Sequence, residues 1–375
     1  MRDTTLVFSS RLPWQTPRNE LTKRLERKGG AAFDLTESNP TRAGILYDRA
    51  AILAPLSNPA SLVYEPTAAG LPSARGAVAS YCGVSPDQVL LTASSSEAYS
   101  FLFKLLCDPG DEILVPRPSY PLFEFLASLE AVAVKQYPLR YQEGWWMDSA
   151  AVREMITSRT RAIVAVNPNN PTGSYVKQTE LAALESFGIP IISDEVFADY
   201  SFEPDPQRVI TLASVSPRAF SLGGFSKLLG LPQMKLGWIV TQDPQARARL
   251  ELIADTFLSV SAPVQHAAAG WLELRRPFQA AMMARLTGNL AWLRTQCQPL
   301  RVEGGWYVTL RLPRTRSEEE WAIAFLEEDD VLIQPGYFYD FETEAFAVLS
   351  LLTRPEIFRE GVSRILRRTD VRPVT

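Results

Sequence analysis

One lysine of the sequence lies in a loop built mostly from glycine, serine and leucine. Lys227 belongs to residues 221–232, between an apolar stretch at 219–220 and a strand-like stretch at 236–240. A surface lysine needs no such setting, whereas an amine that must be approached closely and held still does. Schiff-base formation with a carbonyl requires this, because the amine must be partly desolvated to be a free nucleophile. The loop therefore marks Lys227 as a candidate nucleophile.

Polar or aromatic side chains follow two apolar, strand-like segments nearer the N-terminus. Ser94 and Ser95 follow residues 89–91 and open a helical pattern. Backbone N–H groups at such a helix start can hold an anion such as phosphate, although an ordinary helix cap explains the serines equally well. Tyr120 follows residues 112–115 in a proline-rich loop. Its ring can stack on a flat ligand ring, and packing in the core is the alternative.

Two further strand ends carry an amide and a carboxylate. Asn170 lies in residues 167–173, where two Asn-Pro steps and a glycine predict a rigid turn after 162–166. Asp194 follows the apolar run at 190–193. A carboxylate there is costly unless it meets a cation or a proton donor, such as a protonated pyridine nitrogen. Capping of the next helix is the structural alternative.

Two residues near the lysine complete the set of strand-end side chains. Ser226 directly precedes Lys227, and Lys235 precedes the strand-like stretch that follows the loop. Lys235 is either a phosphate contact or a solvated surface charge. Because ligands of open parallel sheets bind beyond the carboxyl ends of the strands, we expect these side chains to meet at one edge of a sheet.

Short apolar runs alternate with helical patterns through the middle of the chain, which predicts an α/β fold with a mostly parallel sheet flanked by helices. The seven expected strands are residues 89–91, 112–115, 131–137, 162–166, 190–193, 219–222 and 236–240. The last third reads as a smaller α/β lobe. We therefore expect a large cofactor-binding domain at 46–274 and a small domain formed from both chain ends, 1–45 and 275–375.

Composition excludes several classes of protein. The 375 residues carry a net charge of −4, so no basic face for nucleic acid or a membrane surface is expected. The single histidine, His266, argues against histidine triads and multi-histidine metal sites, and we expect no metal. The three cysteines show no C-x-x-C spacing, and neither a signal core nor a long apolar run is evident. These features predict a soluble, cytoplasmic protein.

The order of these features resembles the class I/II aminotransferases, which are pyridoxal-phosphate enzymes of fold type I in the aspartate aminotransferase-like superfamily. The resemblance covers nearly the whole chain. Its most specific parts are Asn-Pro-Thr-Gly at 170–173, Asp-Glu-Val at 194–196 and Ser-Lys at 226–227. Tyr-Glu-Pro at 64–66 and Pro-Gly at 335–336 also match. The resemblance implies pyridoxal 5'-phosphate as the cofactor.

The resemblance also implies a role for each matching residue. Lys227 would form the internal aldimine and then move the proton between the substrate and the cofactor. Asp194 would pair with the protonated pyridine nitrogen, Asn170 would hydrogen-bond the ring hydroxyl oxygen, and Tyr120 would stack on the ring. The phosphate contacts would be Ser94, Ser95, Ser226 and Lys235. Tyr64 would reach the phosphate of the neighbouring subunit, which implies a homodimer.

The sequence departs from the family pattern at four positions. Gly224 stands where a phosphate-binding serine is common, and Lys235 stands where an arginine is common. Phe197 stands where most relatives have a tyrosine on the ring hydroxyl oxygen, and Val348 stands where relatives have the arginine that clamps the substrate carboxylate. Arg354 or Arg42, with Asn39 beside the latter in sequence, would then take the carboxylate. Alternatively, the substrate is not an ordinary α-amino acid.

The resemblance implies an aminotransferase that works by a ping-pong mechanism between an amino donor, expected to be an amino acid, and a 2-oxo acid. A carbon–sulfur β-lyase or another eliminase of the same fold is the alternative, because it needs the same lysine, aspartate and asparagine. A non-catalytic regulator of this fold would carry a DNA-binding extension, and we expect none here, because neither a segment of helix-turn-helix length nor a basic face is evident. The amino donor itself is not defined by the sequence.

Overall fold

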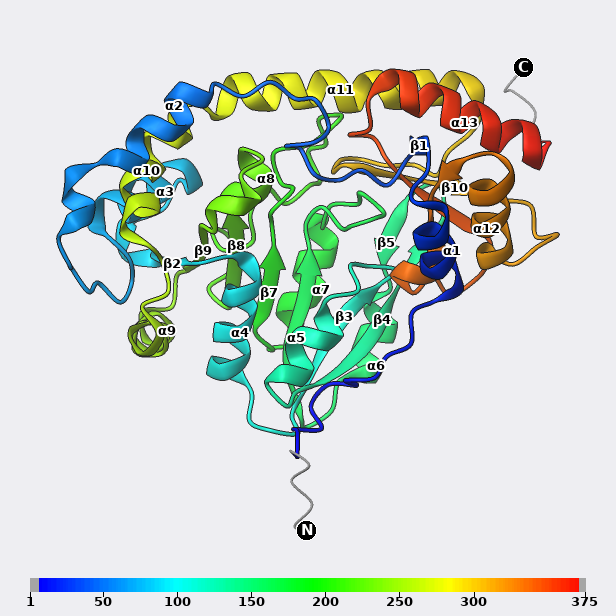
Figure 1. Cartoon of the computed structure of the whole chain (residues 1–375). Coiled ribbons are helices and arrows are strands. Elements are labelled where there is room, and N and C mark those ends of the chain that lie inside the picture. The colour runs from blue at the N-terminus through cyan, green and yellow to red at the C-terminus, as the bar shows by residue number, and fades with distance from the viewer. Residues whose placement is uncertain (1–6, 371–375) are drawn as a thin grey trace, which may run out of the picture.

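The structure, a computed structural model, describes residues 7–370. Its centre is an eight-stranded sheet with the strand order β2-β9-β8-β7-β6-β3-β4-β5 (Figure 1). Its strands are β2 (Val89–Thr92), β3 (Glu112–Arg117), β4 (Ala133–Tyr141), β5 (Trp145–Met147), β6 (Thr160–Val166), β7 (Ile191–Asp194), β8 (Ala219–Gly224) and β9 (Gly237–Thr241). The predicted α/β class is confirmed.

The sheet is parallel through its middle and antiparallel near its two edges. Strands β4, β3, β6, β7 and β8 pair in parallel, while β9 is antiparallel to both β2 and β8. All seven expected strands form. The eighth, β5, pairs antiparallel with β4 and was not predicted, because its three residues are too short for a recognisable alternation.

Helices cover both faces of the sheet, so each central strand is apolar on both sides. On one face Ile113 and Val115 of β3 pack with α4 (Ser95–Leu106), α5 (Phe123–Leu129) and α9 (Pro244–Phe257). On the other face Leu114 packs with α6 (Ser149–Met155) and α7 (Gln178–Ser186). This double burial explains why the strands read as continuous apolar runs in the sequence.

The N-terminal segment lies against the last third of the chain. Strand β1 (Phe33–Asp34) pairs in parallel with β11 (Val331–Leu332), and β10 (Tyr307–Arg311), β13 (Phe346–Ser350) and β12 (Gln334–Pro335) form a three-stranded antiparallel sheet. This pairing supports the proposed small domain of 1–45 and 275–375 beside 46–274. Its residues 1–6 and 371–375 lie outside the described residues.

A long helix, α11, runs along the top of the molecule from beside α10 to α13 (Figure 1). The remaining helices are α1 (Glu20–Lys28), α2 (Arg49–Leu53), α3 (Pro72–Cys82), α8 (Phe225–Leu228), α10 (Ala262–Glu273), α11 (Arg275–Gln296), α12 (Glu318–Glu328) and α13 (Pro355–Thr369). No helix in the described part of the chain is long and apolar enough to cross a membrane.

Candidate active site

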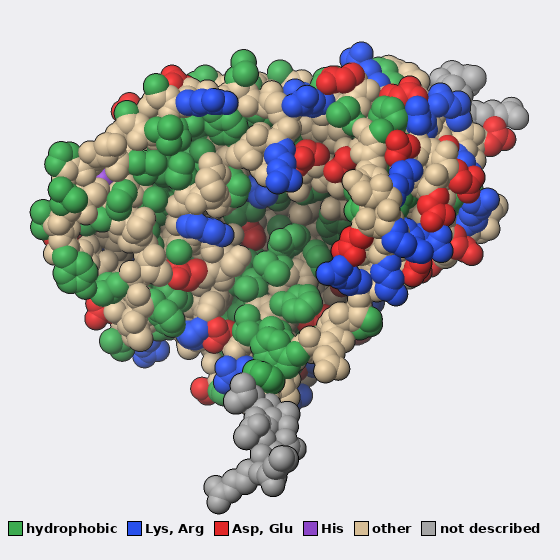
Figure 2. Space-filling view, viewed as in Figure 1, with side chains coloured by type: hydrophobic (Ala, Val, Ile, Leu, Met, Phe, Trp, Pro, Cys, Tyr) green, Lys and Arg blue, Asp and Glu red, His purple; other side chains and the backbone are tan. Residues whose placement is uncertain are grey.

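The ends of neighbouring strands meet at one edge of the eight-stranded sheet. Thr92 at the end of β2 pairs with Gly237 at the start of the antiparallel β9, and Gly237 pairs with Gly224 at the end of β8. Asp194 at the end of β7 is in register with Val166 at the end of β6. The loops that follow β2, β6, β7 and β8 therefore leave the sheet at the same edge. Figure 2, which has the same view as Figure 1, shows a hollow in the middle of the molecule, close to the position of α8 in Figure 1.

Lys227 lies in α8, a single helical turn directly after β8. Its Nζ is 4.9 Å from the centre of the Trp306 ring and 5.3 Å from the centre of the Phe197 ring. Burial lowers the pKa of Lys227 to about 8, and the negative charge of Asp194 opposes part of this shift. A lysine with this pKa has a much larger neutral fraction near neutral pH than an ordinary lysine, and attack on a carbonyl requires the neutral amine.

Asp194 keeps part of its surface accessible, but protein atoms closely surround its carboxylate. The Tyr99 hydroxyl donates to Oδ2 at 2.9 Å, and the Val196 backbone N–H donates to Oδ1 at 3.2 Å. Burial raises the pKa of Asp194, and these hydrogen bonds together with the charge of Lys227 oppose the rise. A carboxylate in this position favours a cationic ligand group beside it.

The first turn of α4 lies against the backbone of β9. Ser94 caps this helix, and its Oγ accepts a hydrogen bond from the Glu97 backbone N–H at 3.2 Å. A Cβ atom at Gly237 would lie 2.9 Å from the carbonyl carbon of Ser94 and 3.1 Å from the nitrogen of Ser95. Only glycine fits at this distance, so the close approach of the two backbones depends on it.

The segments that carry Ser226 and Lys235 are tied together beside this helix start. The Phe225 backbone N–H donates to the Leu236 carbonyl oxygen at 3.0 Å. Lys235 adopts the left-handed conformation, with φ of 52°, immediately before β9. The structure thus brings Ser94, Ser95, Ser226 and Lys235 to one region, where the N-terminus of a twelve-residue helix favours an anion.

Asn170 lies in the loop after β6, which is joined to the loop after β3. The Asn169 side-chain amide donates to the Pro118 carbonyl oxygen at 2.9 Å, and the Ser119 hydroxyl donates to Asn169 Oδ1 at 2.8 Å. Asn170 Oδ1 is buried and has no hydrogen-bond partner among residues 7–370. An unpartnered buried polar atom is costly, so its presence points to a ligand at this position.

Tyr120 lies close to the carboxylate of β7 and to two other tyrosines. Burial and the charge of Asp194 raise the pKa of Tyr120. Burial raises the pKa of Tyr307 and of Tyr339, and the nearby Tyr120 adds to the rise in both. Tyr120 itself is 46% exposed, so one side of its ring is free for a ligand.

Sequence reasoning did not place Tyr99 or Trp306 at the site. Tyr99 lies one helical turn after Ser95 in α4, so its spacing from the helix start was a usable signal. Trp306 follows a glycine pair, which marks a tight turn but does not tell which part of the chain the turn approaches.

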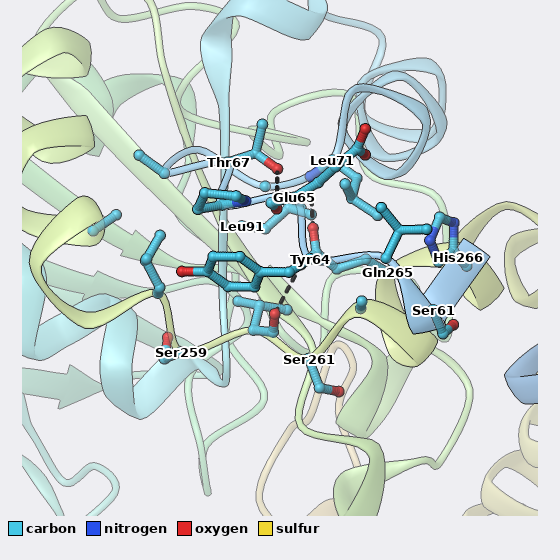
Figure 3. A pocket seen from close by; sticks show the side chains of 18 of the residues that line it. Ser61, Tyr64, Glu65, Thr67, Leu71, Leu91, Ser259, Ser261, Gln265 and His266 are labelled. Atoms are coloured by element: carbon cyan, nitrogen blue, oxygen red, sulfur yellow. Dashed lines mark hydrogen bonds between the residues drawn. The ribbon is translucent and has the colours of Figure 1, made fainter. Parts of the chain in front are cut away.

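Tyr64 lies apart from the residues described above. It is 79% exposed and lines a pocket of about 340 Å³ between the loop at 61–71 and the residues at 258–266. Figure 3 shows its ring lying across this pocket, with Gln265 and His266 on one side. None of the other predicted site residues lines the pocket. Within one chain, therefore, the structure does not bring Tyr64 to them.

The predicted substrate contacts lie on two adjoining segments. Arg354 precedes α13 and passes Gly44 so closely that a Cβ atom at that glycine would be 3.1 Å from Nε. Arg42 is exposed, and Asn39 uses its Oδ1 to accept a hydrogen bond from the Thr41 backbone N–H at 3.0 Å. None of these three side chains hydrogen-bonds to the Lys227 amine within residues 7–370.

Val348 occupies the centre of the small sheet and is completely buried. In the register of β13 it lies between Thr309 of β10 and Gln334 of β12. Facing positions on paired strands share one side of a sheet, so Thr309 and Gln334 lie beside the Val348 side chain, and both are neutral. Neither Val348 nor these two neighbours can supply a guanidinium group.

The fold and this set of side chains define an α/β protein with a lysine at the end of one strand and the N-terminus of α4 at the same sheet edge. Residues 53–357 match the family described as aminotransferase class I and II, and the chain belongs to this family. Pyridoxal phosphate is the cofactor of the family.

Relatives support the same assignment, and solved structures share the fold. Tyrosine aminotransferase of Mus musculus is 29% identical over 330 residues, which are 79% of this chain and 71% of that protein. Nicotianamine aminotransferase 1 of Oryza sativa subsp. japonica is 31% identical over 209 residues, but the match spans only 42% of that protein and 52% of this chain. The alanine aminotransferase of Pyrococcus furiosus superposes with a TM-score of 0.83 at 24% identity over 94% of this chain and 95% of its own. The aspartate aminotransferase of Thermotoga maritima superposes with a TM-score of 0.81 at 22% sequence identity, over 93% of this chain and 94% of its own. These two structures show the fold.

The residues at the sheet edge fit pyridoxal phosphate. Asn170 Oδ1 is buried without a protein donor in the described chain, so the amide is available to a ligand, and its N–H rather than this oxygen would donate to the ring oxygen. Gly237 lets the backbone of β9 lie close to the start of α4. The N-terminus of this helix favours a phosphate group. Asp194 offers a carboxylate for a ring nitrogen, and Lys227 offers an amine for an aldehyde.

Proposed function

We propose that this chain is an aminotransferase that transfers an amino group from an amino donor, expected to be an amino acid, to a 2-oxo acid in two half-reactions of a ping-pong cycle. The observation that carries this proposal is the enclosed Lys227 amine, whose pKa burial lowers to about 8, next to the Asp194 carboxylate. A β-lyase would use the same two groups, but the relatives named above are aminotransferases, which supports transamination. We also propose a cytoplasmic location, and this proposal is based only on the cysteine content of the chain.

Each predicted residue has a proposed part in this reaction. When bound, pyridoxal phosphate supplies an aldehyde for the lysine and an electron-withdrawing ring. Asp194 holds the proton on the ring nitrogen, and the Tyr99 hydroxyl orients that carboxylate. Asn170 contacts the ring oxygen and Tyr120 packs on the ring face. The phosphate is held by the remaining polar set, namely Ser94, Ser95, Ser226 and Lys235.

Lys227 has a second proposed task as a base beside the bound substrate. With the cofactor and an amino donor in place, its neutral amine would take a proton from the substrate α-carbon and hold it on Nζ for return. The lowered pKa serves this task, because a neutral amine is a base, and the Asp194 charge helps the amine to hold the proton it has taken. The aromatic rings of Phe197 and Trp306 exclude water from this exchange.

We propose a homodimer in which Tyr64 serves the partner's phosphate site. Figure 2 shows hydrophobic side chains gathered at the end of the molecule that carries α2, α3 and α10. The exposed apolar residues around the Tyr64 pocket are Leu62, Val63 and Leu258, with exposed fractions of 91%, 61% and 40%. Apolar side chains exposed together commonly mark an interface between subunits. Sedimentation equilibrium is the check, and a monomer mass at micromolar concentration contradicts the dimer.

The reaction itself is tested by adding single amino acids to the cofactor-loaded protein without any 2-oxo acid acceptor. We expect a true donor to shift the visible absorption band and to release one 2-oxo acid per site, after which release stops. Continuous release of pyruvate and ammonia without an acceptor is the result of an eliminase and contradicts transamination. If no α-amino acid shifts the band, the search for substrates moves to amines, aldehydes and elimination substrates.

The substitution of Arg354 or Arg42 by alanine tests how a substrate carboxylate is held. A charge-assisted hydrogen bond is worth about 1.5–3 kcal/mol, so loss of the correct arginine is expected to raise KM for the amino donor about 10- to 150-fold. Arg359→Ala is the matched control, because Arg359 follows Arg354 by five residues, within α13, but packs over Trp292. Unchanged KM and kcat in both test variants would mean that neither arginine binds the substrate.

A further inference from the structure

The carboxylate of Glu318 holds both ends of one loop of the small sheet. This loop, residues 336–345, connects β12 to β13. Glu318 Oε2 accepts a hydrogen bond from the Tyr337 backbone N–H at 2.5 Å, and Oε1 accepts one from the Phe346 backbone N–H at 2.7 Å. Because each oxygen binds a different end of the loop, one side chain closes the loop at its base.

The fold gives this carboxylate a fixed place. Glu318 is the first residue of α12 and is only 2% exposed. A negative charge in the first turn of a helix is favoured by the helix dipole. A Cβ atom at Gly336 would lie 2.6 Å from Glu318 Oε1, so only glycine lets the loop backbone come this close. Glu318 is therefore a buried anchor for the loop.

The same loop rests on the eight-stranded sheet. The Ser119 backbone N–H donates to the Tyr339 carbonyl oxygen at 3.0 Å. The Glu342 carboxylate accepts hydrogen bonds from Arg117 and Arg140, both at 2.6 Å. Arg117 ends β3, and Arg140 lies in β4. The loop thus bridges the small sheet and the carboxyl end of β3.

Ser119 connects this contact to two of the candidate cofactor residues. It directly precedes Tyr120, and its hydroxyl donates to Asn169 Oδ1 at 2.8 Å, next to Asn170. Ser119 is 4% exposed, so water does not compete for these hydrogen bonds. A displacement of loop 336–345 is therefore passed to the backbone that carries both candidate residues.

We propose that Glu318 is a positioning residue, which acts through loop 336–345 and Ser119 on the two loops that carry Tyr120 and Asn170. Glu318 itself touches neither substrate nor cofactor. The consequence for cofactor binding rests on the proposed function of Tyr120 and Asn170, whereas the positioning of the two loops requires no ligand.

The first test is hydrogen exchange of backbone amides in the full chain as purified, read by mass spectrometry. Glu318→Gln keeps the size of the side chain but replaces one acceptor oxygen by an NH₂ group, which cannot accept a hydrogen bond. We expect the amides of 336–346, 117–123 and 167–173 to exchange about 10- to 100-fold faster, as loss of a hydrogen bond to a charged group predicts. Unchanged exchange at 117–123 and 167–173 overturns the proposal.

The second measurement is the affinity for pyridoxal phosphate, taken from the visible absorption band during titration with the cofactor. Misplaced Tyr120 and Asn170 are expected to raise the Kd of Glu318→Gln about five- to tenfold, the loss of one ordinary hydrogen bond. Faster exchange of all three segments with an unchanged Kd supports the positioning role and contradicts the cofactor contacts of Tyr120 and Asn170. The two parts of the inference are thus tested separately.

Glu320→Gln is the matched control. Glu320 lies in the same first turn of α12, and its Oε2 also accepts from a backbone N–H, that of the helix cap Ser317, at 2.8 Å. We expect this change to lower stability and to leave exchange at 117–123 and the Kd unchanged. If Glu318→Gln does not fold, Gly336→Ala keeps the carboxylate and forces the loop backbone away from Oε1, with the same expected result.

Glu342→Gln separates the anchor from the ion pairs of the loop. The side chains of Glu342, Arg117 and Arg140 are 30%, 37% and 45% exposed, so their pairs contribute little and we expect a smaller effect. Faster exchange at 117–123 in Glu342→Gln but not in Glu318→Gln overturns the proposal, because the ion pairs then position the loop. Failure of the proposed function is measured by 2-oxo acid release in the unmodified protein and does not alter the exchange result.

Discussion

Replacing Lys227 by alanine is expected to lower the turnover of amino group transfer by at least about 10⁴-fold, because one side chain supplies both the amine that holds the cofactor and the base that moves the proton. The environment of the lysine prepares it for both tasks, since burial lowers its pKa to about 8. Single-turnover release of 2-oxo acid from the reconstituted variant is the measurement.

Lys104→Ala is the matched control for this experiment. Lys104 is a lysine on α4 whose partner is the carboxylate of Glu130, so its removal is expected to leave turnover unchanged. A Lys227→Ala variant that retains more than about one hundredth of the wild-type rate would show that another amine serves as the base. Lys235 would then be the next candidate, because it lies at the same sheet edge.

Substitution of Asp194 by asparagine is expected to lower kcat/KM about 10²- to 10⁴-fold. Removing one partner of an enclosed ion pair costs about 3–5 kcal/mol, and each 1.36 kcal/mol is a factor of ten in rate. The amide keeps the hydrogen bond from Val196 in reach but lacks the charge that holds a proton on the ring nitrogen. The variant is also expected to release its cofactor more readily on dialysis.

Glu195→Gln is the matched control, because Glu195 is the next residue and also a half-buried carboxylate. It accepts hydrogen bonds from the hydroxyls of Ser193 and Ser221 and from the Leu212 N–H, all at 2.8 Å, and so belongs to the interior of the protein. We expect this change to lower stability while kcat/KM stays within a few-fold of wild type. Equal losses of activity in both variants would contradict a special role of Asp194.

The local pattern of the chain was enough to predict the fold class and seven strands of the large sheet. Strands that helices bury on both faces must be apolar at every position, and such runs are visible without knowledge of their neighbours. The three residues of β5 are too few for this pattern, with Trp146 exposed between two buried residues. Strand order was likewise out of reach, since β9 lies between β2 and β8, far from β2 in sequence.

The candidate residues at strand ends were also visible in the sequence, because each follows its strand directly. Lys227, Asp194 and Asn170 remain predictions as functional groups until the variants are measured. The structure adds that they share one sheet edge and that an oxygen of Asn170 lacks a protein partner among the residues described. It does not bring Tyr64 to them, so the role of that residue depends on a second subunit.

The sequence by itself determined the family, the α/β fold and the side chains that follow the strands, since all of these are encoded in short segments. Only the tertiary structure decided which distant groups surround them. The Tyr99 hydroxyl reaches Asp194 across 95 residues, and the indole of Trp306 lies over Lys227 although the two belong to different lobes of the proposed division. Such contacts depend on how the sheet and the lobes pack together, and no local periodicity records that packing.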